Sequence, residues 1–215
     1  MSFDLTSSSR CTIACAASDR GALELLAPVE HKVWTALPGI ERRRDWLCGR
    51  VAGKRAVGAH VGIGDLQRLV LTSRDRSAPV CTERDRGPLP LALSLTHADG
   101  RALAVAAPLG DRVGIDLERS GAVASHHEHL FVGRAERDRS PDMDPTVRWV
   151  LKEAAWKAFC CPQRLPLRAL ELELDANDAL CAVVIAGVRQ SARGRLLRVW
   201  PGFVAALVHV SAEVM

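Results

Sequence analysis

Two acidic side chains stand two positions apart in the segment Gly114-Ile115-Asp116-Leu117-Glu118. If this segment is a strand, alternate residues point to one face, so Asp116 and Glu118 project together while Ile115 and Leu117 face the core. Two neighbouring carboxylates repel each other unless a cation lies between them. A hard divalent ion such as Mg²⁺, which prefers oxygen ligands, is the natural partner. Two solvated acids on an edge strand are the alternative.

A second group of charged side chains lies in the segment from Trp149 to Lys157, which reads Trp-Val-Leu-Lys-Glu-Ala-Ala-Trp-Lys. On a helix, Glu153 and Lys157 are neighbours on one face, and Lys152 lies one position round from Glu153. One carboxylate and two ammonium groups would then project from nearly one side. The alternative for Glu153 and Lys157 is an exposed ion pair worth about 0.3–0.5 kcal/mol.

A strand and a helix must hold these residues. We predict a strand over Val113–Glu118, followed by a helix with Asp144 as its N-cap and Pro145 at its first position. Residues 119–144 between them are polar, and we expect a short helix near Glu136. Further strands are predicted over Leu170–Leu174, Leu180–Ala186 and Phe203–Val210.

The part of the chain before Pro108 offers a different set of elements. A long helix is predicted over Glu41–Gly58, where Arg43, Arg50 and Lys54 share one face. That basic face suits phosphate groups, or it is simply a solvated face. The first strand is predicted over Thr12–Ala17, short strands and loops over Val70–Pro90, and a hairpin over Leu91–Leu95 and Arg101–Ala107 with its turn at Asp99-Gly100.

These elements predict two domains, residues 1–109 and 110–215, separated at a break that contains Pro108 and Gly110. Each half offers one long helix and several strands, although no sequence repeat is visible. The predicted fold class is therefore α+β, built from two similar halves.

The composition is that of an ordinary globular protein, with 48% apolar and 25% charged residues in 215. The net charge of +4 suits an anionic partner, but five Trp, four Phe and no Tyr give no stacking platform for nucleic acid. The seven cysteines contain no Cys-x-x-Cys pair, so we expect reduced thiols in a cytoplasmic protein. No apolar run approaches the roughly 20 residues that span a bilayer, and no membrane association is expected.

Together, Gly-Ile-Asp-x-Glu and Trp-x-x-Lys-Glu-Ala-x-x-Lys closely resemble the signature of the 4′-phosphopantetheinyl transferases. Three weaker segments agree with this family. Ser94–Gly100 resembles its Ser-x-Ser-His-x-x-Gly segment, Arg43–Arg50 its arginine-rich helix, and Ala27–Glu30 its Pro-x-Glu turn. The chain is longer than the short, trimeric holo-carrier synthases and is similar to the surfactin-type members. That similarity implies a monomeric pseudo-dimer of two α+β halves with the active site between the halves.

The resemblance also implies a reaction. The 4′-phosphopantetheine arm of coenzyme A would pass to a serine of an apo acyl or peptidyl carrier protein, an acidic partner, with release of 3′,5′-ADP. Asp116, Glu118 and Glu153 would hold Mg²⁺, and Glu153 would be the general base, directly or through water. Lys157 and Lys152 would neutralise phosphate oxygens during catalysis. The residues implied in coenzyme A binding are His97, Thr96, Arg43, Arg50, Lys54, Asp116, Lys152 and Lys157.

Two other functions stay open on the sequence alone. A magnesium-dependent phosphohydrolase would use the same acids with water as its nucleophile, and a non-catalytic module would only bind coenzyme A or a carrier. A separate segment, His126-His127-Glu128-His129, looks like a metal cluster. Adjacent histidines in an extended loop rarely converge on one ion, so we expect a solvated loop away from the metal.

Overall fold

The protein divides into two compact units, residues 1–111 and 112–215, whereas the sequence placed the division after residue 109. Each unit combines helices with antiparallel sheet, which confirms the α+β class. None of the helices in the described part of the chain is long and apolar enough to cross a bilayer. The computed structural model describes residues 11–17, 21–73, 77–159, 165–177 and 179–212.

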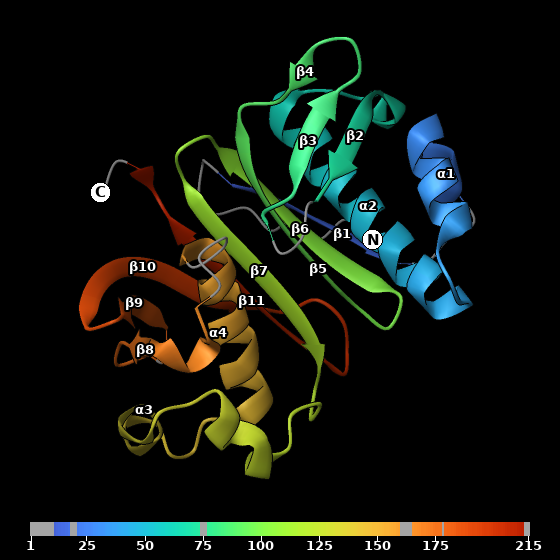
Figure 1. Ribbon diagram of the computed structural model, residues 1–215. Coiled ribbons are helices and arrows are strands. Elements are labelled where there is room, and N and C mark those ends of the chain that lie inside the picture. The colour runs from blue at the N-terminus through green and yellow to red at the C-terminus, as the bar shows by residue number, and fades with distance from the viewer. Residues whose placement is uncertain (1–10, 18–20, 74–76, 160–164, 178, 213–215) are drawn as a thin grey trace. The chain divides into compact units, whose positions relative to one another are not determined.

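Unit 1 is built around the long helix α2 (Ile40–Val61), as Figure 1 shows. Its sheet has the order β1-β6-β5 with antiparallel neighbours, and a second sheet has the order β2-β3-β4. The helix α1 begins at Pro28, because a helix tolerates proline at its first position. The remaining bounds are β1 Thr12–Ala17, η1 Ala22–Leu25, α1 Pro28–Ala36, η2 Leu66–Arg68, β2 Leu69–Thr72, β3 Val80–Glu83, β4 Gly87–Pro88, β5 Leu91–Ala98 and β6 Arg101–Pro108.

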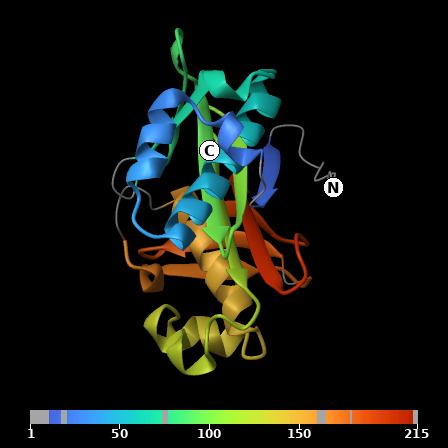
Figure 2. The ribbon, with the colours of Figure 1, turned by 90° about the vertical axis from the view of Figure 1, so that its right-hand side faces the viewer.

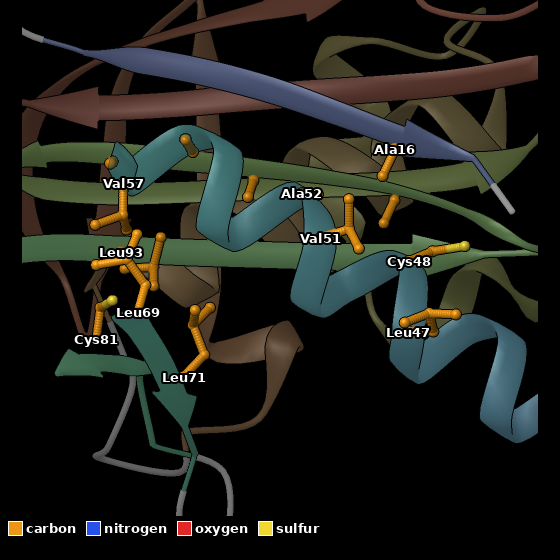
Figure 3. Packing of buried hydrophobic residues seen from close by; sticks show 14 of the residues in the cluster. Ala16, Leu47, Cys48, Val51, Ala52, Val57, Leu69, Leu71, Cys81 and Leu93 are labelled. Atoms are coloured by element: carbon orange, nitrogen blue, oxygen red, sulfur yellow. The ribbon is translucent and has the colours of Figure 1, made fainter. Parts of the chain in front are cut away.

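The core of unit 1 lies between α2 and its two sheets (Figure 3). Val51 and Val57 of α2 are buried against Leu69 and Leu71 of β2 and Leu93 of β5. The predicted hairpin is confirmed, since β5 pairs with β6 across a turn at Asp99-Gly100 in which both residues have positive φ, 48° and 72°. That turn type matches the right-handed twist of the strands.

Unit 2 packs the helix α4 (Pro145–Phe159) on one sheet of order β7-β11-β10-β9-β8. The predicted N-cap is confirmed, because Asp144 Oδ1 accepts hydrogen bonds from the backbone N–H groups of Thr146 at 2.8 Å and Val147 at 3.1 Å. Figure 2 shows η3 and α3, coloured yellow-green, at the bottom beside the first turns of α4. The bounds are β7 Arg112–Arg119, η3 Ser125–Leu130, α3 Arg134–Arg139, η4 Leu167–Ala169, β8 Leu170–Leu174, β9 Leu180–Ile185, β10 Val188–Leu197 and β11 Phe203–Val210.

The strand β10 was not predicted from the sequence. Its ten residues, Val-Arg-Gln-Ser-Ala-Arg-Gly-Arg-Leu-Leu, do not alternate between apolar and polar side chains. The pairing with β9 shifts register between Ser191 and Gly194, and the buried side of the strand is formed by small residues there. The two units share one pairing order. In unit 1, β1 pairs with β6 and β6 with β5, and in unit 2, β7 pairs with β11 and β11 with β10.

A fully buried lysine lies in the middle of α2. Lys54 has 0% exposure, and its Nζ lies 2.5 Å from Glu30 Oε2. The ammonium group also donates to the carbonyl of Leu25 at 2.8 Å, while Glu30 Oε1 accepts from the backbone N–H of Leu71 at 3.0 Å. The ion pair therefore joins α2 to the start of α1 and to β2.

The helix α4 of unit 2 carries the same arrangement. Lys152 is also 0% exposed, and its Nζ donates to Glu136 Oε2 at 2.6 Å and to the carbonyl of Leu170. Glu136 Oε1 accepts from the backbone N–H of Leu172 at 3.3 Å. The two helices share an Arg-x-x-x-Lys-x-Ala pattern, from Arg50 to Ala56 and from Arg148 to Ala154, so the halves do contain a short repeat.

Candidate active site

Glycine at the start of the acidic segment determines how closely α4 approaches β7. A Cβ atom added to Gly114 would lie 1.8 Å from the carbonyl oxygen of Ala154 and 2.9 Å from the backbone nitrogen of Ala158. Only glycine allows this contact between strand and helix. Because side chains alternate along a strand, Asp116 and Glu118 leave β7 on the same face as Gly114, toward α4.

We expect Gly114→Ala to destabilise unit 2 by about 3 kcal/mol, because the new methyl group meets backbone atoms that cannot rotate away. Urea unfolding followed by circular dichroism would measure the change. The matched control is Gly133→Ala, where the added Cβ atom meets nothing within 4 Å and φ is −75°. Equal stability of the two variants would show that α4 does not need this close contact.

A direct contact between the two segments joins Lys157 of α4 to β7. Its Nζ donates to Asp116 Oδ1 at 2.7 Å and to the carbonyl of Ile115 at 3.0 Å. The Asp116 side chain is 8% exposed and the Lys157 side chain 24%, so the pair lies at the edge of the protein interior. Ile115 and Leu117 are buried at 0% and 1%, as the alternation predicts.

Glu153 lies in the electrostatic field of the same residues. Burial raises the pKa of Glu153 above its ordinary value, the ammonium group of Lys157 opposes the rise, and the charges of Asp116 and Glu118 add to it. The carboxylates of Asp116 and Glu118 on β7 therefore lie within electrostatic range of Glu153 on α4. Together with Lys157 they bring three carboxylates and one ammonium group into one region, which carries excess negative charge when all are ionised.

This donor set fits a hard divalent cation, since Asp116, Glu118 and Glu153 offer only oxygen ligands. In the described residues, no three potential ligands are already gathered tightly enough to hold an ion. The fit therefore rests on donor chemistry and on the mutual repulsion of the carboxylates, which a cation would relieve.

The catalytic and phosphate-binding roles predicted for Lys152 are wrong. Lys152 has 0% exposure and points to Glu136 and β8, whereas the half-buried Lys157 points to Asp116. Burial lowers the pKa of Lys152 and the carboxylate of Glu136 opposes that shift. Lys152 and Glu153 are adjacent in sequence, but successive side chains on a helix differ by about 100° around its axis. Lys152 therefore points into the core, while Glu153 points toward the acidic residues of β7.

In unit 1, the residues predicted to share one basic face of the long helix lie in different surroundings. Lys54 is buried against Glu30, so it is not part of an exposed basic stripe, and its predicted binding role is wrong. Arg43 donates to the carbonyls of Leu37 at 2.7 Å and Thr35 at 3.1 Å, and these bonds tie it to the end of α1.

Arg50 and His97 are the basic residues of unit 1 that suit an anion best. The guanidinium group of Arg50 lies 4.6 Å from the Trp46 ring centroid, and burial lowers the pKa of Arg50. Within the described residues, its Nε is buried and has no hydrogen-bond acceptor. His97 is exposed at the end of β5, whereas Thr96 is 7% exposed and leaves the strand on the opposite face. The side chains of Thr96 and His97 therefore point to opposite faces of β5.

The histidine segment is a short helix rather than a loop, although His126, His127 and His129 are exposed as predicted. It forms the 3-10 helix η3, and its Glu128 is buried in contact with Arg148 Nε at 2.8 Å and Arg137 Nε at 3.4 Å. His127 lines a cavity of about 550 Å³ that Glu118 also lines. The cavity wall therefore contains one of these histidines together with one of the predicted metal ligands.

No family model and no curated protein matches the chain. Among solved structures, the chain is similar to holo-[acyl-carrier-protein] synthase from Thermotoga maritima, with 22% sequence identity and a TM-score of 0.37. The matched region covers 46% of this chain and 61% of that synthase, which is less than two thirds of its length.

Proposed function

We propose that this protein transfers the 4′-phosphopantetheine arm of coenzyme A to a serine hydroxyl of an apo carrier protein. The observation that carries the proposal is the grouping of Asp116, Glu118, Glu153 and Lys157 on facing segments of β7 and α4. Those four residues come from two separate motifs that together resemble the transferase signature. Magnesium held by the three carboxylates would neutralise charge on the pyrophosphate of coenzyme A.

The residues of this site suit the proton and charge movements of the reaction. The serine oxygen would bond to the phosphorus that carries the arm, and the bond from that phosphorus to the oxygen of 3′,5′-ADP would break. Glu153, whose pKa is raised, would take the hydroxyl proton directly or through water. Lys157 would offset the negative charge that develops on the departing 3′,5′-ADP.

The coenzyme A contacts that the sequence implies for unit 1 are a separate part of the proposal. We assign phosphate binding to Arg50 and His97, because Arg50 Nε is buried and, within the described residues, lacks an acceptor. A phosphate oxygen would supply that acceptor, and arginine binds phosphate through charge-assisted hydrogen bonds. The carrier partner, the monomeric state and the cytoplasmic location are parts of the same proposal.

The decisive experiment incubates the protein with coenzyme A, Mg²⁺ and apo carrier proteins of the fatty-acid, polyketide and peptide types. We expect at least one carrier to gain the mass of phosphopantetheine on serine, with equimolar release of 3′,5′-ADP. Exhaustive chelation should abolish the reaction, and Mg²⁺ or Mn²⁺ should restore it. Release of a nucleotide without carrier modification would favour the phosphohydrolase instead, and full activity after chelation would contradict the metal assignment.

We expect Lys157→Ala to lower kcat by about a hundredfold, while the Kd of coenzyme A changes only a few-fold. The reason is that the charge opposite this ammonium group grows as the bond to 3′,5′-ADP breaks. Turnover assays and isothermal titration calorimetry would separate the two effects. Lys32→Ala is the matched control, since Lys32 is an exposed lysine of α1. Equal losses in kcat and affinity would make Lys157 a simple substrate-binding residue.

A further inference from the structure

The ammonium group of Lys157 is bonded to one of the proposed metal ligands. Its Nζ lies 2.7 Å from Asp116 Oδ1 and 3.0 Å from the carbonyl oxygen of Ile115, so both acceptors belong to β7. Asp116 is also one of the three carboxylates that we assign to the divalent cation. Two cations of different kinds, an ammonium group and a metal ion, therefore have the same carboxylate as their partner.

Charge repulsion makes these two cations compete for Asp116. The Asp116 side chain is 8% exposed, so little water separates and screens charges that gather around it. A divalent ion and an ammonium group each favour the ionised carboxylate, but they repel each other when both lie against it. The carboxylate is therefore neutralised best by one of them at a time.

Lys157 is able to leave Asp116, whereas the other lysine of α4 is held in place. The side chain of Lys157 is 24% exposed, and a lysine ends in a point charge on a flexible stem. Its ammonium group can therefore change partner by side-chain rotation alone. Lys152, in contrast, is 0% exposed and joins the carboxylate of Glu136 to the carbonyl of Leu170 in the core.

A permanent link between α4 and β7 is the competing role for Lys157. The close approach of these two elements has another cause, because Gly114 lets the strand pack directly against the helix backbone at Ala154. A second carboxylate also lies within electrostatic range of the ammonium group. Glu153 is one turn before Lys157 on the same helix face, and the charge of Lys157 acts on it.

We propose that Lys157 holds the Asp116 carboxylate until a divalent cation binds and then releases it, an inference that rests on the proposed function. The released ammonium group is then available to a phosphate oxygen of coenzyme A. Binding of the cation and binding of the phosphate are thereby coupled, because the ion that takes Asp116 also frees the lysine.

Nuclear magnetic resonance of the lysine side chains tests this exchange in the whole protein. The chain contains four lysines, Lys32, Lys54, Lys152 and Lys157, so isotope-labelled Nζ groups give a simple spectrum. Without added metal, we expect a coupling across the hydrogen bond from Lys157 Nζ to the carboxyl carbon of Asp116. Saturating Mg²⁺ should abolish this coupling. The coupling from Lys152 to Glu136, on the same helix, is the matched control and should persist.

A calorimetric titration with Mg²⁺ provides a second and independent measurement. Lys157→Met removes the competing cation, so we expect Mg²⁺ to bind about tenfold more tightly than to the wild-type protein. Lys32→Met, at an exposed lysine of α1, is the matched control and should leave the Kd of Mg²⁺ unchanged. An unchanged Kd in Lys157→Met would show that the lysine does not compete for Asp116, and it would overturn the exchange.

The same titrations separate the failure of this exchange from the failure of the proposed function. If the wild-type protein binds Mg²⁺ and the coupling between Lys157 and Asp116 survives saturation, the exchange is wrong and the metal site stands. If calorimetry detects no binding of Mg²⁺ to the wild-type protein, the metal site fails, and the proposed function and the exchange fail with it.

Discussion

Replacing Asp116 with alanine is expected to lower the rate of carrier modification by about three orders of magnitude. Asp116 has two roles in the proposed reaction. It is one of the three proposed carboxylate ligands, and its Oδ1 accepts a hydrogen bond from Lys157 Nζ at 2.7 Å. Magnesium tolerates poor coordination badly, so losing one anionic ligand should also weaken its binding. The rate would be measured by carrier mass shift, and Mn²⁺ affinity by calorimetry.

The fold should survive Asp116→Ala because two effects on stability oppose each other. The variant loses the ion pair with Lys157, but it also removes a charge that raises the pKa of Glu153. The matched control is Asp142→Ala, an exposed acid of the same unit, which should keep full activity. An active Asp116→Ala protein with unchanged Mn²⁺ affinity would place the metal elsewhere and remove the main support for the transferase proposal.

Lys152→Met is expected to have the largest effect on stability, a loss of about 3–5 kcal/mol in the free energy of unfolding. The substitution leaves the carboxylate of Glu136 buried beside an apolar side chain, and it removes the bond to the Leu170 carbonyl. Denaturant unfolding would measure the loss. Adding Glu136→Gln should recover part of it, because the amide keeps an acceptor for the Leu172 N–H without the buried charge.

Lys152 and Lys157 both lie on α4, and replacing each with methionine should give opposite results. Lys157→Met should leave stability nearly unchanged and damage turnover, whereas Lys152→Met should damage stability and leave the turnover of the folded fraction intact. Lys54→Met should resemble Lys152→Met, because Lys54 is equally buried and bound to Glu30. A stable but inactive Lys152→Met protein would restore the phosphate-binding role that the sequence suggested.

Much of the fold could be predicted because local chemistry marks its boundaries. Asp144 and Pro145 mark the start of α4 in the sequence, and Asp99-Gly100 marks the turn between β5 and β6. The strand β10 escaped prediction because its pattern is irregular. Its buried positions include Ala192 and Gly194, which are too small to produce a hydrophobic alternation, while arginines occupy neighbouring positions.

The sequence predicted the candidate site only for side chains that are neighbours within one strand or one helix. Alternation along a strand places Asp116 with Glu118, and helical periodicity places Glu153 with Lys157. Periodicity does not say which helix face meets the core, so Lys152 was misplaced. Its buried partner, Glu136, lies in a stretch of weak periodicity, and only the recurrence of Arg-x-x-x-Lys-x-Ala at Arg50 connects the two lysines.

The paired lysines show which part of the shared helix pattern serves stability alone. Arg55 and Ala59 stand in unit 1 where Glu153 and Lys157 stand in unit 2, while the lysine before them is the same in both. Each unit can thus keep its buried lysine for stability, whatever residues follow it on the helix. A search for proteins that share the proposed site should therefore ask for Glu153 and Lys157, because the buried lysine indicates only a packed helix.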